Sequence, residues 1–172
     1  MVCKHTIYKI MKYTNRLSRN ISKIDKLPTF LRAWFLDRSI GKVVKFVGTA
    51  GIHFEKMTCE EVVITLHNKQ KVQNHIGQIH AAATTLLAET ATGMVVGMNI
   101  PDDKIPLMKN LSVNFTRRSK GTQKAIAVLS EEQIKHIRTA DKGELIVPIK
   151  ITDETGQEVI EASMNWAWIP KK

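Results

Sequence analysis

One stretch of the chain is apolar at almost every position rather than along a single face. Between Ile79 and Ala91 nearly all residues are Ala, Leu, Ile or Thr, which predicts a helix that is buried nearly all round. Glu89 lies inside this stretch, and a carboxylate is costly to bury without a partner. Either Glu89 is bonded structurally, to backbone N–H groups or to Thr85 or Thr92, or its apolar surroundings raise its pKa and suit it to acid–base chemistry.

Shorter apolar runs predict the strands. Leu111, Val113 and Phe115 alternate with polar neighbours, as a half-buried strand requires. Residues 153–156 end in glycine and favour a hairpin turn between two strands near the C-terminus. The strand-like runs cover residues 42–47, 52–57, 61–73, 111–117, 125–129, 144–152 and 158–169.

Two further helices are marked by their ends. Thr29 can cap a short helix that Gly41 closes, and Ser130 forms a capping box with Gln133 at the start of another. Most of the strands follow the long apolar helix and are joined by short turns. The pattern therefore predicts one α+β domain, with a long central helix among five or six strands of an antiparallel sheet.

Charge is distributed unevenly along the 172 residues, and this changes the picture of the N-terminus. The net charge is +10, and residues 1–45 alone carry eleven Lys and Arg against two Asp. Apolar residues are interleaved with these bases, so the segment can form a basic amphipathic helix. Three interpretations stay open: a helix packed on the domain, a helix on a membrane surface, or a mitochondrial-type transit peptide.

The compartment is expected to be the cytoplasm. Cys3 and Cys59 are the two cysteines, and they cannot build a disulfide framework or a zinc site. No apolar run is long enough to cross a bilayer. Signatures of P-loop nucleotide hydrolysis, Rossmann redox chemistry, zinc proteases and serine hydrolases do not occur in the sequence either.

What remains is a polar motif that leads into the apolar helix. Asn74, Gly77 and His80 are spaced three residues apart, and Glu89 follows nine residues after His80. With its strand–loop–helix context, this pattern resembles the hotdog-fold acyl-CoA thioesterases over about residues 40–170. The Asn-His-x-Gly motif, the helix ending in Ala-Glu, the Arg-Arg-x-x-Gly turn and the Ser-Glu-Glu-Gln helix look most like a poorly characterised bacterial branch of that superfamily.

The resemblance implies a curved antiparallel sheet wrapped around the central helix in residues 41–172, with residues 1–40 as a basic helical extension. It also implies that Glu89 is the catalytic carboxylate, acting on water or on the thioester carbonyl. Asn74 would orient the water or the carbonyl, and His80 would stand at the start of the helix. Ala81 replaces the usual glycine, but its N–H can still polarise the carbonyl oxygen.

The spacing of these residues favours a dimer. His80 and Glu89 would lie about 13 Å apart along one helix and on opposite sides of it. One carbonyl cannot touch both side chains of one helix, so if both act on the same carbonyl, they must come from two chains. The expected assembly is a homodimer, or a dimer of dimers, with equivalent composite sites.

Other residues are expected to contact the acyl-CoA substrate. Arg117, Arg118 and Lys120 suit the phosphates of coenzyme A, although they can equally form a solvated turn. Asn110 resembles a polar residue on the substrate side, and Gly77 belongs to the motif itself. No metal and no redox cofactor is implied, coenzyme A being part of the substrate.

Alternatives remain at the level of function and of single residues. Asn74 could merely cap the helix, and His80 could be an N-terminal helix residue bonded to a carbonyl. A hotdog module that binds acyl-CoA or lipid without catalysis is the second functional class. A hydroxyacyl-thioester dehydratase that uses His75 and Glu89 ranks lower, as does a basic protein that binds membranes or nucleic acid through residues 1–45.

Overall fold

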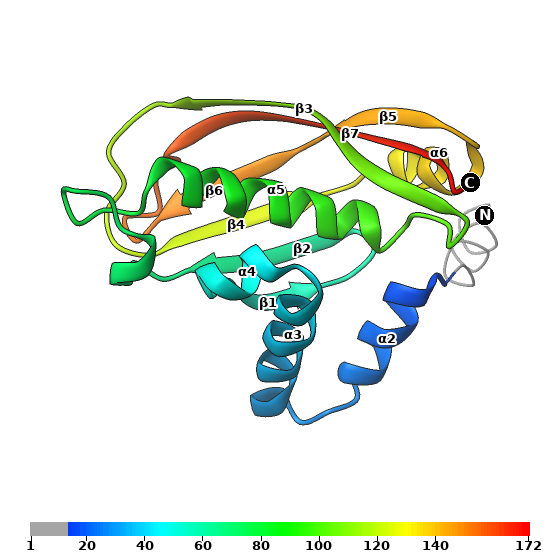
Figure 1. The fold of residues 1–172 in the computed structure, drawn as a ribbon, viewed down its shortest axis with the longest axis horizontal. Helices are drawn as coiled ribbons and strands as arrows, with labels where there is room; N and C mark the ends of the chain where they lie inside the picture. The colour runs from blue at the N-terminus through cyan, green and yellow to red at the C-terminus, as the bar shows by residue number, and fades with distance from the viewer. Residues whose placement is uncertain (1–13) are drawn as a thin grey trace, which may run out of the picture.

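A long helix, α5 (Ala81–Gly97), lies in the concave side of an antiparallel β-structure (Figure 1). The computed structural model describes residues 14–172. Helix α5 contacts strands from both hydrogen-bonded groups, because Ala, Leu, Val and Thr occupy nearly all of its positions. Leu87, Ala88 and Ala91 are fully buried. The α+β class with antiparallel sheets is therefore confirmed.

The strands form two hydrogen-bonded groups that are joined through one interrupted strand. One group has the order β1 (His53–Met57), β2 (Glu61–Leu66), β4 (Gln123–Val128), β6 (Ile149–Asp153). The other has the order β3 (Lys104–Phe115), β7 (Ile160–Pro170), β5 (Gly143–Val147). The single strand expected over residues 144–152 is divided between β5 and β6 at Pro148, which has no N–H to donate to a neighbouring strand.

The burial of α5 is less complete than the sequence predicted. Thr85, Leu86, Glu89 and Gly93 are only partly buried, and intervals of three or four residues place them along one side of α5. The other sides pack on the sheet, where the Trp166 indole donates to Thr92 at 2.9 Å. A half-covered stripe is therefore left along the helix in a single chain.

Within residues 14–172, three helices precede the first strand: α2 (Arg16–Ile24), α3 (Thr29–Val43) and α4 (Lys45–Ala50). Helix α2 is tied to the end of α5, because the Asn15 amide donates to the carbonyls of Gly97 and Ile100 at 2.7 and 2.6 Å. Ile21 is buried against the domain. This part of the basic segment is thus a packed helix, whereas residues 1–13 lie outside the described part of the chain.

The strand predicted over residues 42–47 is wrong, because this segment ends α3 and begins α4. Val47 and Ala50 face the core as helical neighbours. Gly41 and Gly48 allow the two helices to approach closely, since a Cβ on Gly41 would lie 2.9 Å from the Cα of Gly48. Tertiary packing therefore overrides the β-branched residues of this run. Helix α3 also continues across the expected boundary at residue 40.

Two other boundaries differ from the prediction, and one helix agrees closely. Strand β3 begins at Lys104, seven residues before the strand that was expected to begin at Leu111. Residues 70–72 form a short 3₁₀ helix rather than the end of β2. Helix α6 (Glu131–Thr139) begins with the predicted capping box of Ser130 and Gln133.

The fit between α5 and β7 can be tested with two glycines of the same helix. A Cβ on Gly93 would lie 2.6 Å from the Trp166 ring, which is held by its bond to Thr92. We expect Gly93→Ala to lower the free energy of unfolding by about 1–3 kcal/mol through overpacking. Gly97→Ala is the control, because its Cβ would meet only a flexible Leu17 methyl at 3.3 Å. Urea unfolding measures both, and equal stability of the two variants would contradict the tight packing.

Candidate functional site

The loop before α5 is organised by Asn74. Its side-chain oxygen accepts hydrogen bonds from the N–H groups of Ile76 and Gln78, both at 3.0 Å. Gly77 takes a positive φ of 74° at the tip of this turn, a conformation that favours glycine. Asn74 is therefore a turn residue and not the helix cap, and no bond to its amide nitrogen occurs within residues 14–172.

The start of α5 leaves one backbone donor open. His80 is the N-cap, and its Nδ1 accepts from the Ala82 N–H at 3.0 Å. The Ala81 N–H precedes the first intrahelical bond and has no partner among the residues that the structure describes. An unpaired N–H at a helix N-terminus, where the dipole is positive, can stabilise a developing negative charge on an oxygen.

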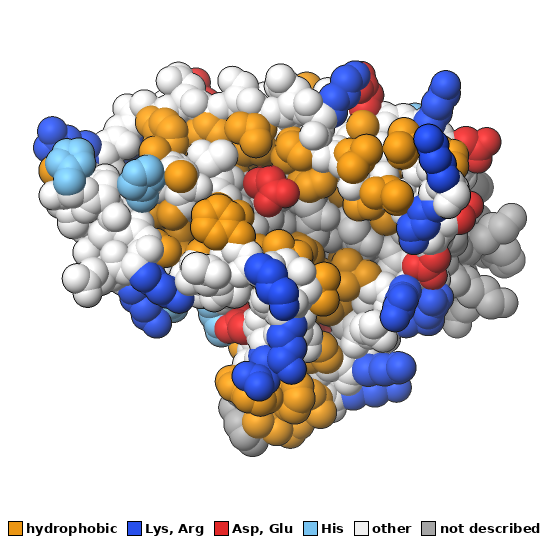
Figure 2. Space-filling view, viewed as in Figure 1, with side chains coloured by type: hydrophobic (Ala, Val, Ile, Leu, Met, Phe, Trp, Pro, Cys, Tyr) orange, Lys and Arg blue, Asp and Glu red, His pale blue; other side chains and the backbone are white. Residues whose placement is uncertain are grey.

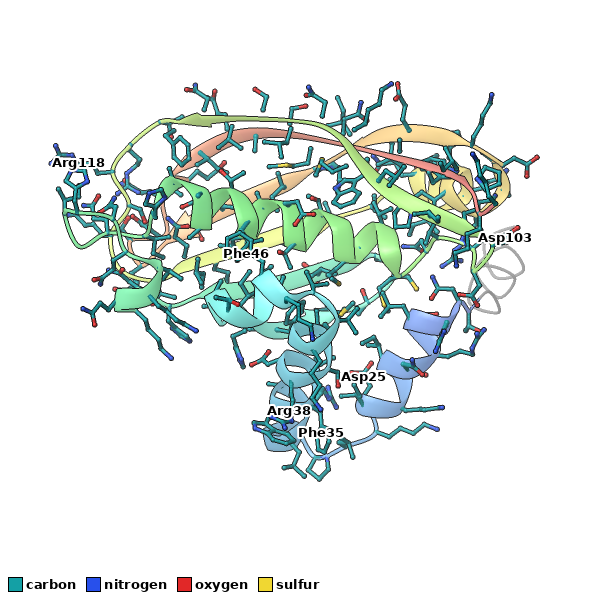
Figure 3. The ribbon with its side chains drawn as sticks, viewed as in Figure 1. Asp25, Phe35, Arg38, Phe46, Asp103 and Arg118 are labelled. Atoms are coloured by element: carbon teal, nitrogen blue, oxygen red, sulfur yellow. The ribbon has the colours of Figure 1, made fainter. Side chains whose placement is uncertain are left out.

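A cavity of about 120 Å³ joins this helix start to the basic turn after β3. It brings together Asn74, Ala81, Arg117 and Arg118, which the sequence predicted as site residues. Figure 3 shows Arg118 at the end of the molecule beside the loop that leads into α5. The residues that sequence reasoning missed in this cavity are Gln78, Ile79, Thr84, Phe115, Ser119, Gln123 and Val159.

Two of these missed residues carry a buried polar connection. Gln123 accepts a bond from the Thr84 hydroxyl and donates one to the Ser119 hydroxyl, both at 2.9 Å. A buried glutamine at the start of a strand, facing a threonine one turn inside α5, fixes the strand and the helix relative to each other. In the sequence, the one indication of this connection was that Gln123 is polar at a position where the alternation of β4 requires an inward-facing side chain.

The basic turn is held by a buried acid. The Asp153 carboxylate accepts bonds from Arg117 and from the Lys120 N–H, both at 2.8 Å. Burial alone would raise the pKa of Asp153, but bonds from Thr155, Lys120 and Arg117 outweigh it and lower the pKa to about 2. The Arg117 charge is therefore paired, whereas the side chains of Arg118 and Lys120 are exposed and make no ion pair in the described part of the chain.

Glu89 lies two turns further along α5 and does not line this cavity. Its carboxylate is half-buried, and no hydrogen bond or ion pair to it occurs among residues 14–172. Thr85 and Thr92 bond to backbone carbonyls instead. Because burial has no compensating partner here, it raises the pKa of Glu89.

Asn110 and His75 lie apart from these groups. Asn110 pairs with Asn165 across β3 and β7, next to a bulge, on the face of the sheet opposite to Trp166 and α5. His75 is exposed in the turn that Asn74 forms. One chain therefore brings neither residue to the side of Glu89.

Strand β3 completes the surroundings of the site with an uncovered edge. It has β7 on one side and, within residues 14–172, no strand on the other. Leu111 and Phe115 pair with inward-facing residues of β7, yet they remain more than two-fifths exposed. Figure 2 shows hydrophobic side chains over much of the face that α5 and β3 form. A long apolar edge strand is normally covered in a native assembly.

Known proteins share this sequence pattern and this architecture. Residues 32–169 match a family described as a domain of unknown function, DUF4442. The chain belongs to this family. No protein of curated function is significantly similar to this DUF4442 protein.

Solved structures share its fold over most of its length. A protein of unknown function from Pseudomonas aeruginosa, described as "Probable Thioesterase", is 27% identical, with 84% of this chain and 97% of that chain covered and a TM-score of 0.71. A thioesterase from Haemophilus influenzae is 15% identical, with 78% and 90% covered and a TM-score of 0.63. A thioesterase enzyme from Staphylococcus aureus is 22% identical, with 73% and 99% covered and a TM-score of 0.60.

The predicted resemblance is thereby confirmed: the DUF4442 protein has the hotdog fold of thioesterase-like proteins, in a poorly characterised branch. No group of three His, Cys, Asp or Glu in the described residues could hold a metal ion. No helix in residues 14–172 is long and apolar enough to cross a membrane.

The Asp153 anchor predicts a pH dependence of stability. Its folded pKa of about 2 lies below the ordinary value for Asp, so its contribution is present above about pH 4 and is lost as the pH falls toward 2. We expect Asp153→Asn to lower the free energy of unfolding at pH 7 by about 2–3 kcal/mol and to flatten its decline in acid. Denaturant titrations from pH 2 to pH 7 measure this. The control is exposed Asp103→Asn, and a variant at 153 with unchanged stability would contradict the anchor.

Proposed function

We propose that this DUF4442 protein is an acyl-CoA thioesterase that hydrolyses the thioester by water attack, with Glu89 as the general base at a dimer interface. The single observation that carries this proposal is the state of Glu89. A half-buried carboxylate without a partner and with a raised pKa is what a general base near neutral pH requires. A structural acid would be expected to accept hydrogen bonds, and Glu89 accepts none from residues 14–172 at its carboxylate.

The proposed step conserves atoms and charge. The Glu89 carboxylate removes a proton from water while the water oxygen bonds to the thioester carbon, and the carbonyl oxygen becomes an oxyanion. The Ala81 N–H stabilises that oxyanion, with the Asn74 amide beside it. The C–S bond then breaks, and the proton passes from Glu89 to the coenzyme A thiolate. The products are a carboxylic acid and free coenzyme A.

The two groups that would act on one carbonyl must come from different chains. Ala81 and Glu89 are eight residues apart on an unbroken helix, which separates them by about 12 Å. The half-covered stripe of α5 and the bare edge of β3 favour a second copy on this face, because both are apolar surfaces that one chain leaves open. We therefore propose a homodimer, or a dimer of dimers, in which Glu89 faces the Asn74, His80 and Ala81 of its partner.

The basic turn suits the coenzyme A end of the substrate. Arg118 and Lys120 are free to bind phosphate, and Arg118 lines the cavity at the start of α5. Arg117 is paired with Asp153, and its role is to position the turn. Gly77 acts through the turn conformation rather than by contact. Asn110 could reach substrate only from the outer face of the sheet.

The Staphylococcus aureus thioesterase supports the choice of residues. Two of its structures carry a single replacement by alanine, one of a glutamine and one of a glutamate. These two residues are separated by the same number of positions as Asn74 and Glu89. An amide and a carboxylate at this spacing were thus singled out for study in a protein of the same fold.

Replacement of Glu89 by Gln tests the proposed base. We expect Glu89→Gln to lower turnover of acyl-CoAs by about 100-fold or more, because an amide cannot accept the proton. Its free energy of unfolding should be equal or higher at pH 7. Because the folded pKa of Glu89 is raised, stability falls as the pH rises above the ordinary Glu value, and the full cost is present above the folded pKa. Thiol release from an acyl-CoA panel and denaturant unfolding measure the two effects.

Exposed Glu131→Gln on α6 is the matched control, and it should leave both quantities unchanged. Equal turnover by wild type and Glu89→Gln would remove Glu89 from the mechanism. A wild-type protein that binds acyl-CoA without releasing thiol would identify a non-catalytic module instead.

Mixed dimers test the composite site. Proline at position 81 would remove the N–H, and helix α5 should tolerate it because Ala81 is the first helical residue and His80 has a ψ of 143°. We expect Ala81→Pro and Glu89→Gln to be inactive separately. After subunit exchange, one site of each mixed dimer has both groups intact, so about one quarter of wild-type activity should return. If both groups acted within one chain, mixing would restore nothing.

A further inference from the structure

The tip of α3 exposes two large aromatic side chains on a basic part of the molecule. Trp34 is 55% exposed and Phe35 is 37% exposed, and their rings meet edge to face with centroids 4.8 Å apart. The Arg38 guanidinium lies over the Trp34 ring at 5.6 Å. Figure 3 places Phe35 and Arg38 at the end of α3 that points away from α5. An exposed Trp–Phe pair on a projecting helix is an apolar surface without a partner in the described chain.

A basic groove runs directly beside this aromatic pair. It has a volume of about 440 Å³, and Arg38, Lys42 and Lys45 line it together with Trp34. In Figure 2, hydrophobic side chains cover the lower tip of the molecule, and Lys and Arg side chains follow immediately above it. None of the three bases makes an ion pair with another described residue.

The acids near the groove are bonded to other groups of the protein. The Asp37 carboxylate is bonded to the His53 ring and to the Phe54 N–H, both at 2.7 Å. Asp25 lies 3.7 Å from the Arg32 guanidinium. The groove therefore has three unpaired bases and one acid, Asp37, in its lining, whereas most Lys side chains on the sheet are paired with Glu.

Within the described part of the basic segment, α2 does not expose its apolar residues. Its apolar residues face the protein: Ile21 is buried, and Leu17 and Ile24 pack against the core. Helix α3 instead keeps Leu36 and Ile40 in the core and leaves its aromatic pair outside. Of these two helices, it is therefore α3 that offers an exposed apolar surface.

We propose that the α3 tip docks on the surface of an anionic lipid bilayer. Trp34 and Phe35 insert at the level of the headgroups, and Arg38, Lys42 and Lys45 bind the lipid phosphates. An anionic bilayer has an apolar interior next to a layer of negatively charged headgroups. On the protein, the aromatic pair lies next to the basic groove, so each part of this surface can meet the layer that suits it. This docking does not depend on the thioesterase proposal, because α3 carries none of the residues assigned to catalysis.

Tryptophan fluorescence gives a direct test. Of the three tryptophans in the sequence, Trp166 and Trp168 are buried, so a change on binding reports Trp34. The probe is vesicles of equimolar phosphatidylcholine and phosphatidylglycerol, with pure phosphatidylcholine vesicles for comparison. We expect a shift of emission to shorter wavelength, protection from acrylamide, and co-sedimentation with the anionic vesicles only, weakening as salt is added.

Variants separate the two parts of the surface. Arg38→Gln/Lys42→Gln/Lys45→Gln should bind about 100-fold more weakly, since each base near an anionic bilayer contributes roughly a factor of five. The control Lys109→Gln/Lys135→Gln/Lys150→Gln removes the same charge from β3, α6 and β6, and it should bind as wild type does. Trp34→Ser/Phe35→Ser should also weaken co-sedimentation, with unchanged far-ultraviolet circular dichroism.

Three results would overturn the proposal. The first is wild-type protein that does not sediment with anionic vesicles at low salt. The second is equal weakening by the control and groove triple variants, which would indicate a response to net charge alone. The third is a fall in molar mass of Trp34→Ser/Phe35→Ser by light scattering, which would assign the aromatic pair to contact with a second copy. Inorganic phosphate and chloride are compared as competitors at equal ionic strength. If phosphate displaces the protein from the vesicles no better than chloride does, the surface binds a bilayer and not a discrete phosphate ion.

Discussion

The structure depends on one unbroken helix that must satisfy two demands. Helix α5 fills the concave side of the sheet, so nearly every side chain is small or apolar. It also carries a carboxylate and, two turns earlier, an unpaired backbone donor. A rigid helix fixes the distance between these groups, and no change of side-chain rotamer can bring them to the same atom. Any chemistry that uses both must therefore be built between helices.

This constraint gives a common reason for features that look unrelated in one chain. The stripe of α5 around Glu89 is half-covered, and β3 presents an apolar edge without a neighbour. Both features would be defects in a monomer, because open edges and apolar stripes promote association. In the proposed dimer they are the surfaces that enclose the reacting carbonyl with the attacking water and exclude bulk solvent.

The sequence predicted the parts of the structure that short-range patterns determine. Alternation located most strands, and the capping box located α6, because both depend on neighbouring residues. The segment after Gly41 was read as a strand from its β-branched residues, although it is helical and packs Val47 and Ala50 into a core that many other segments form. The buried hydrogen bonds of Gln123 and Asp153 were not predicted, because their partners lie in other segments of the chain and only the fold brings them together.

The buried pairing of Arg117 with Asp153 has a consequence for recognition. Asp153 holds the turn by the Arg117 guanidinium and by the Lys120 backbone N–H, so the turn is already shaped before a ligand arrives. A preorganised turn loses little conformational entropy on binding, and the loss that remains falls mainly on the side chains of Arg118 and Lys120. If the turn binds coenzyme A as proposed, its selectivity among ligands would depend on the geometry of their phosphates. Closure of the loop around the ligand would contribute little.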